Sequence, residues 1–120
     1  MEQENKFELI VSIVNRGHSD DVVSGAREAG ARGGTIFYGR GTGNSERDSI
    51  MGVSIEPEKE IILTLTEKED KSKIMKAICE KSNMNNPGEG ICFSLPVSQV
   101  RGINSTAKQE DEKQTEENKG

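Results

Sequence analysis

Four short runs of β-type residues, with an amphipathic stretch after the first and the third, constrain the fold of this chain most strongly. Each run is rich in the apolar, β-branched and aromatic residues that favour strands, and each stretch repeats apolar residues at the helical period. Strands are expected at residues 7–14, 35–40, 60–66 and 91–97, with a further short strand at 52–55. This order predicts an α+β, ferredoxin-like β-α-β-β-α-β sandwich, in which an antiparallel sheet carries two helices on one face.

Residue types at the helix ends predict where both helices begin and end. Ser19 is the expected N-cap of the first helix, and Gly30 is its expected C′ residue. Thr66 and Glu69 have capping-box spacing before the second helix. That helix is expected to end near Asn83, where turn-forming residues begin. The predicted buried faces consist of Val22, Val23, Ala26 and Ala29 in the first helix and of Ile74, Ala77 and Ile78 in the second.

Length and composition divide the chain into one small domain and two terminal segments. A chain of 120 residues has room for one compact domain. Residues 104–120 contain one aliphatic side chain, Ala107, among charged and polar residues, so they cannot bury enough apolar surface to offset the entropy of ordering. We therefore expect a short N-terminal extension at 1–5, the domain at 6–103 and a disordered acidic tail at 104–120.

Charge and hydropathy argue against two classes of partner. The net charge of −5 argues against nucleic-acid binding, which usually requires a basic surface. The sequence shows neither a signal peptide nor an apolar run of about 18 residues. A cytoplasmic protein without direct membrane insertion is therefore expected.

Two glycine-rich segments, residues 33–43 and 87–93, each adjoin a predicted strand. Glycine lets a ligand approach backbone N–H groups, and rows of such groups make concave sites for phosphates. Arg40 lies among three of these glycines, and its planar guanidinium suits phosphate, although a solvated charge at a turn is the alternative. Neither segment has the spacing of a P-loop or of a dinucleotide fingerprint. The pair nevertheless indicates a protein that holds a nucleotide.

The sequence shows no catalytic constellation. His18 is the only histidine and lies beside a predicted turn, where a solvated or capping role fits better than a metal or base role. Cys79 and Cys92 lie in apolar patterns and are expected to be buried free thiols, in preference to a disulfide or a metal pair. We therefore expect no catalytic residue, no metal site and no redox cofactor, and hence no enzyme.

The order of elements and the glycine turns together resemble the P-II signal-transduction family, over about residues 7–103. The matching motifs are Gly34-Thr35 at the start of the second strand, Gly41-Thr42-Gly43 after it, and Gly88-Glu89-Gly90 before the last strand. The resemblance implies a homotrimer that binds ATP or ADP in clefts between subunits, with Mg²⁺ accompanying ATP. It also implies a regulated partner, either a membrane transporter or a regulatory protein, in nitrogen or energy metabolism.

The same resemblance implies roles for two groups of residues. The nucleotide would contact Gly34, Thr35, Arg40, Gly41, Thr42, Gly43, Gly88, Glu89, Gly90 and Arg101. Thr35 would meet the adenine, the glycines would lie along the ribose and phosphates, and Arg101 would reach a phosphate held by the neighbouring subunit. The partner-binding loop would consist of Asn44, Ser45, Glu46, Arg47, Asp48 and Ser49.

The chain departs from the family's pattern at three places. The partner-binding loop is short and lacks the tyrosine that is modified in some members. Ile91 stands where a lysine usually follows the Gly-acid-Gly turn, and the paired arginines near the C-terminus reduce to Arg101. The chain therefore resembles a divergent P-II-like member with a shortened loop.

Two other hypotheses stay open from the sequence. The missing lysine and the missing second arginine fit a trimeric protein-interaction module that has lost nucleotide binding. The element order also fits a small ferredoxin-like enzyme or a trimeric metal-tolerance protein, although no ligand cluster supports either. The trimer has independent physical support, because a small domain with one apolar sheet face gains stability by burying that face against copies of itself.

Overall fold

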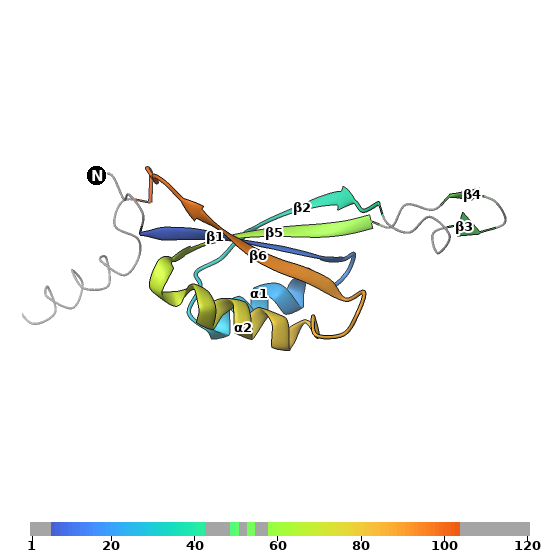
Figure 1. The fold of residues 1–120 in the computed structure, drawn as a ribbon, viewed down its shortest axis with the longest axis horizontal. Coiled ribbons are helices and arrows are strands. Elements are labelled where there is room, and N and C mark those ends of the chain that lie inside the picture. Colours follow the sequence, from blue (N-terminus) through green and yellow to red (C-terminus); the bar gives the residue numbers. More distant parts are fainter. Residues whose placement is uncertain (1–5, 43–48, 51–52, 55–57, 104–120) are drawn as a thin grey trace, which may run out of the picture.

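The computed structural model of the chain describes residues 6–42, 49–50, 53–54 and 58–103 (Figure 1). The long strands are β1 (Phe7–Asn15), β2 (Thr35–Arg40), β5 (Glu58–Glu67) and β6 (Gly90–Val97). The helices are α1 (Ser19–Glu28) and α2 (Lys71–Lys81), and a 3₁₀ turn at Lys68–Asp70 precedes the second helix. Two short strands, β3 (Ser49–Ile50) and β4 (Val53–Ser54), complete the described elements.

The four long strands form one antiparallel sheet in the order β2-β5-β1-β6. Both helices lie on the same face of this sheet, as Figure 1 shows. Each of the four long predicted strands coincides with an observed strand or lies inside it. The predicted ferredoxin-like fold is therefore confirmed.

Side chains alternate along the strands between a helix-side face and an open face. The helix-side face and the two helices enclose one core, made by Ile10, Val14, Val22, Ala26, Ile62, Ile74 and Ile78. The predicted helix faces are confirmed at their centres, while Val23 and Ala29 pack partly buried at the margin of this core. The helices approach each other closely at Gly25, where an added Cβ would lie 2.8 Å from the carbonyl oxygen of Ala77.

The open face of the sheet is apolar, and no described helix covers it. Cross-strand pairs such as Val11 with Leu63 and Val11 with Phe93 place aliphatic and aromatic side chains next to one another. The large side chains left exposed on this face are Phe37, Leu65, Ile91, Phe93 and Leu95, which are between 39 and 58% exposed. An apolar surface of this kind favours burial against another protein surface.

The start of α1 differs from the prediction. The N-cap residue of the helix is His18, and its side chain makes no capping hydrogen bond. Ser19 is the first helical residue, and its Oγ donates a hydrogen bond to Glu60 at 3.2 Å. The predicted Ser19 cap is wrong. The Glu60 carboxylate of β5 instead accepts the N–H groups of Gly17 and His18 before the helix and of Ser19 at its first position.

The start of α2 also differs from the prediction. Thr66 Oγ1 donates to the carbonyl of Glu67, and no side chain caps α2. The 3₁₀ turn at Lys68–Asp70 separates Thr66 from the helix, which begins only at Lys71. The capping-box prediction is therefore wrong.

The predicted end of α1 is confirmed. Gly30 has a φ of +106°, and its N–H donates to the carbonyl of Arg27 at 3.0 Å, as in a C-terminal motif that requires a left-handed residue. Asn83 has the corresponding position after α2, with a φ of +55°. Met84 N–H then donates to the carbonyl of Cys79 at 3.0 Å.

The short strands β3 and β4 pair antiparallel, with Ser49 opposite Ser54 and Ile50 opposite Val53. Val53–Ser54 confirms the middle of the strand predicted at 52–55. Residues 1–5, 43–48 and 104–120 lie outside the described residues, so the predicted extension, most of the loop and the tail stay predictions.

Candidate functional site

The last residues of the first glycine segment, Gly39–Thr42, lie at the same end of the sheet as the turn of the second segment before β6. The antiparallel register brings together the end of β2, the start of β5, the end of β1 and the start of β6. We call this the glycine end, formed by Arg40, Lys59, Asn15 and Gly90. Since β2 and β6 are the two edge strands, the segments are separated by three strand spacings, or about 14 Å.

A relay of two hydrogen bonds crosses the glycine end between the segments. Lys59 Nζ donates to Oδ1 of Asn15 at 2.6 Å, and Asn15 Nδ2 donates to the carbonyl of Gly88 at 3.1 Å. The relay links the first residues of β5 to the turn before β6. It therefore fixes polar groups in the space between the two glycine segments.

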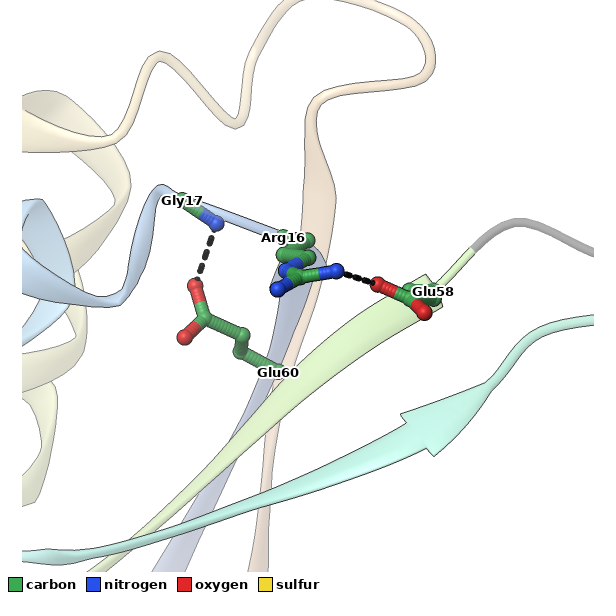
Figure 2. A network of polar contacts seen from close by, with 4 residues as sticks. All are labelled: Arg16, Gly17, Glu58 and Glu60. Carbon is green, nitrogen blue, oxygen red and sulfur yellow. Dashed lines mark hydrogen bonds and ion pairs between the residues drawn. The ribbon is translucent and has the colours of Figure 1, made fainter.

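The acidic neighbours of Lys59 lie on the opposite face of β5. Figure 2 shows Glu58 paired with the guanidinium of Arg16 and Glu60 bound to the loop before α1. A pocket of about 480 Å³ opens on this helix side, lined by Arg16, Tyr38, Gly39, Arg40 and Glu58. The Arg16–Glu58 pair is more than half exposed, so solvent screens it.

Glu60 is the buried charge of this region, with 5% of its surface exposed. Its Oε1 accepts the backbone N–H groups of Gly17 at 2.6 Å, His18 at 3.1 Å and Ser19 at 3.2 Å, the first of which Figure 2 draws. Burial alone would raise the pKa of Glu60, but hydrogen bonds from these N–H groups and from the Ser19 hydroxyl hold the pKa below its usual 4.5. Glu60 is therefore an ionised helix cap that anchors α1 to the sheet.

The first predicted motif, Gly34-Thr35, lies at the far end of β2. A Cβ on Gly34 would lie 2.9 Å from the carbonyl oxygen of Leu63 and 3.2 Å from Cγ2 of Ile62, so this glycine lets β2 approach β5. Thr35 is exposed, and four residues of strand separate it from Arg40, so the two ends of β2 are about 17 Å apart. The edge strand β2 thus connects the predicted adenine contact to the glycine end.

The glycines of the second motif differ in their surroundings. Gly88 has a φ of +84°, and an added Cβ would have nothing within 4 Å, so its backbone faces open space. Gly90 has a φ of +151°, and a Cβ there would lie 2.8 Å from the carbonyl oxygen of Ile13. Glu89 lies between them with its N–H bonded to the carbonyl of Asn86 at 3.3 Å. The turn requires both glycines, and Gly88 presents the more accessible backbone.

Arg101 lies at the other end of the sheet. β6 begins at the glycine end and runs from Gly90 to Val97, a length of about 23 Å, before the chain reaches Arg101. A second pocket of about 650 Å³ opens at that end, and its lining includes Arg32, Lys73 and Ile103. Within one protomer the fold therefore does not bring Arg101 to the other predicted phosphate contacts.

The remaining predicted residues are placed as follows. Gly41 and Thr42 directly follow β2, and Ser49 opens β3, while Gly43 and residues 44–48 lie outside the described residues. In the described ranges the acids that come close enough to share a metal are Glu67, just before the 3₁₀ turn, and Glu69 and Asp70 within it, none of them fully buried. Cys79 and Cys92 are free and half-buried. Over the same ranges, every helix is too short or too polar to span a membrane.

Sequence reasoning missed three residues that organise the glycine end, namely Asn15, Lys59 and Glu60. The available signal was the alternation Glu58, Lys59, Glu60 just before an apolar strand. Extending that strand by two residues would have placed the two acids on one face and the lysine on the other.

Comparisons with known proteins agree with this fold. The family model of the Nitrogen regulatory protein P-II matches residues 7–107. Among solved structures, the chain is similar to a crystal structure of Arabidopsis thaliana PII bound to citrate, with 25% sequence identity and a TM-score of 0.63. That similarity covers 83% of this chain and 85% of the Arabidopsis chain. No curated protein sequence matches.

Proposed function

Because this chain belongs to the nitrogen regulatory protein P-II family, we propose that it is a non-enzymatic, cytoplasmic signalling protein. It binds ATP, accompanied by Mg²⁺, or ADP in clefts between the protomers of a homotrimer. Its partner is a membrane transporter or a regulatory protein in nitrogen or energy metabolism. The observation that carries this proposal is the position of the predicted phosphate contacts at opposite ends of one sheet.

The nucleotide is proposed to lie along the β2 edge. Its adenine is held near Thr35, and its phosphates lie at the glycine end with Arg40 and Gly41. Arg101 of the same protomer lies beyond the far end of β6, whose Gly90–Val97 span is about 23 Å long. A second protomer must therefore supply the arginine that completes each site, as the family resemblance implies.

The open face of the sheet supports the trimer. Phe93 and Leu95 on β6 and Leu65 on β5 are 39 to 48% exposed in one protomer. Burying such side chains against a copy of the chain is favourable by about 25 cal/mol per Å² of apolar surface. The expected assembly in light scattering has three times the 13.1 kDa mass of one chain.

The Arabidopsis relative supports an anion site. Its crystal structure contains bound citrate, which carries three carboxylate groups. The pocket on the helix side of this chain is lined by Arg40 and by Arg16, which already pairs with Glu58, and guanidinium groups are suited to binding an anion.

Calorimetric titration with ATP, ADP and AMP tests nucleotide binding directly. We expect ATP and ADP to bind and to raise the melting temperature. Absence of heat and of any thermal shift at millimolar nucleotide would exclude the proposed nucleotide function.

Mixing two defective variants tests the site between protomers. Arg40→Gln and Arg101→Gln each remove one side of the site, so neither variant alone should bind ATP tightly. After the two are denatured together and refolded, random assembly should restore about one quarter of the sites, because an intact Arg40 then meets an intact Arg101 across the interface. No recovery in the mixture, with each variant trimeric, would place both arginines outside a shared site.

The partner is proposed to contact the loop at Asn44–Ser49. Replacing residues 44–48 by glycine and serine should abolish association with the partner in membrane or soluble fractions, while ATP affinity stays within about threefold because the loop base is intact. Loss of ATP binding in this variant would instead assign the loop to the nucleotide site.

A trimeric interaction module without nucleotide is the second candidate function. It is favoured by Ile91, which is 58% exposed where the family usually has a lysine. From the sequence, Gly43→Val and Gly90→Val are the variants expected to separate the two functions. The structure leaves no room for a side chain at Gly90 beside Ile13, so Gly90→Val would also disturb the fold. Arg40→Gln is the cleaner change: partner binding that survives it and ignores nucleotide would favour the interaction module.

A further inference from the structure

Lys59 places a cation between the two glycine segments, on the open face of the sheet. The register sets it opposite Gly39 on β2 and Asn15 on β1, so all three residues share that face. Its bond to Asn15, which in turn binds the Gly88 carbonyl, holds the ammonium group toward the turn before β6.

We propose that Lys59 binds the outer phosphates of the nucleotide, in place of the lysine that is missing at Ile91. This assignment rests on the proposed nucleotide function and names the cation that the sequence alone does not find. It explains how the chain can hold a triphosphate although the usual lysine is absent.

The Lys59 ammonium has hydrogen-bonding capacity to spare. A lysine has three N–H donors, and Asn15 Oδ1 takes one of them at 2.6 Å. Within the described part of the chain, Lys59 has no carboxylate within 4.0 Å, because its acidic neighbours Glu58 and Glu60 bind groups on the other face. An anion at the glycine end would therefore find an ammonium group that no carboxylate of the described residues neutralises.

Gly41 shapes the path of the Lys59 side chain. A Cβ on Gly41 would lie 2.7 Å from Cε and 3.2 Å from Cγ of Lys59. The lysine stem thus crosses the base of the loop directly over this glycine. The role of Gly41 in the site is then to leave room for Lys59, in addition to any contact of its own backbone with the ligand.

Ile91 and Lys59 lie on the same face of the sheet. Ile91 is opposite Ile13, which is opposite Ile61, and Lys59 is two residues before Ile61 on β5. The two positions are about 12 Å apart by strand spacing, on either side of Asn15. A long side chain from either position can therefore extend over the glycine end.

Titration of Lys59→Met with ATP, AMP and inorganic triphosphate tests the assignment. Loss of one charged contact should lower the affinity for ATP about 10- to 100-fold. The affinity for inorganic triphosphate should fall by a similar factor. The affinity for AMP, which lacks the outer phosphates, should change less than about threefold. Lys76→Met on the exposed side of α2 removes the same charge and should leave all three affinities unchanged.

A rescue variant guards against a folding defect. Lys59→Met/Ile91→Lys restores a cation at the family's usual position and should recover ATP affinity to within about tenfold of the natural protein. Gly41→Ala should displace the Lys59 stem and weaken ATP, whereas Gly33→Ala, where a Cβ meets nothing within 4 Å, should not.

The outcomes separate this inference from the proposed function. If the natural protein binds ATP and Lys59→Met binds it within twofold, nucleotide binding stands and the role of Lys59 is overturned. If Lys59→Met lowers the affinities for ATP and AMP equally, Lys59 does not bind the outer phosphates and the assignment is also overturned. If the natural protein binds neither ATP nor inorganic triphosphate, the proposed function fails and the assignment fails with it.

Discussion

At the scale of single residues, the carboxylate of Glu60 shows how a charge can be buried without destabilising the fold. Three backbone N–H groups and one hydroxyl surround it at the start of α1. The positive end of the helix dipole adds to this stabilisation. A strand residue thus supplies the hydrogen-bond acceptor that a serine cap usually supplies. The local sequence does not show this distant acceptor and therefore predicts Ser19 as the cap.

Glu60→Gln should reduce the free energy of unfolding by about 2 kcal/mol, because it removes the charge from these hydrogen bonds. The folded-state pKa of Glu60 lies below its usual 4.5, so this stability is present above pH 4.5 and is lost as the pH falls through the lowered value. Urea unfolding of both proteins from pH 7 down to pH 3 should show the difference shrinking.

Glu58→Gln is the matched control, since it alters a carboxylate two residues away whose partner is exposed. It should change stability by less than about 0.5 kcal/mol. An equal loss in both variants would contradict the special role of Glu60.

Cys92 should react slowly with alkylating reagents in the folded protein. Burial raises the pKa of its thiol to about 11 from a usual 9.0, although Ser12 donates a hydrogen bond to the sulfur at 3.7 Å. At pH 8 we expect alkylation by iodoacetamide about 100-fold slower than in urea, measured by mass spectrometry. The thiol ionises at a lower pH in the unfolded chain than in the folded protein. The contribution of Cys92 to stability is therefore complete below pH 9 and is lost as the pH rises toward 11. Equal rates in native and unfolded protein would contradict this.

At the scale of elements, the strands were more predictable from the sequence than the helix starts. β2 was predicted to the residue, because turn-forming glycines bound it on both sides. The sequence predicts that β5 begins at residue 60, two residues after its observed start, because the charged side chains of Glu58 and Lys59 are typical of a loop. Their side chains find partners only in the folded sheet, on Arg16 and Asn15.

The same limit applies to the candidate site. Sequence motifs located both glycine turns, since the residue type itself is the signal there. Lys59 carries no such signal, because its position between the turns depends on the pairing of β5 with β1 and β2. Long-range pairing of this kind is not encoded in any local window of residues.

Adjacent glycines before β2 should respond differently to alanine. Gly34→Ala would push a Cβ to 2.9 Å from the Leu63 carbonyl and should cost about 1–3 kcal/mol by forcing β2 away from β5. Gly33→Ala meets nothing within 4 Å and should be neutral or stabilise by up to about 1 kcal/mol. Denaturant unfolding of the two variants checks this, and similar losses in both would show that close strand approach is not the cause.

At the scale of the whole molecule, the sheet has two faces with different tasks. The helix-side face closes the core of one protomer, while the open face stays apolar and partly exposed. A domain of this size buries a modest fraction of its apolar surface by itself. Association of protomers and formation of a complete nucleotide site are therefore proposed to depend on the same surface.

Phe93→Glu should dissociate the proposed trimer, because it places a charge at the middle of the open face, where Phe93 is 40% exposed. Light scattering should then give the mass of one chain, and ATP binding should fall with assembly because Arg101 no longer meets the glycine end. Lys76→Glu on the helix layer should stay trimeric. A trimeric Phe93→Glu protein would show that another surface joins the protomers.

The alternation of Glu58, Lys59 and Glu60 also sets which insertions and deletions this lineage can accept. The loop that follows Gly41, Thr42 and Gly43 can change in length, provided that the chain enters β5 in the same phase. A single residue gained or lost inside β5 would turn Lys59 toward the core and both acids toward the open face of the sheet. Natural variants should therefore differ in the length of this loop, while the number of residues in β5 does not change by one. Sequencing of relatives can reveal this pattern.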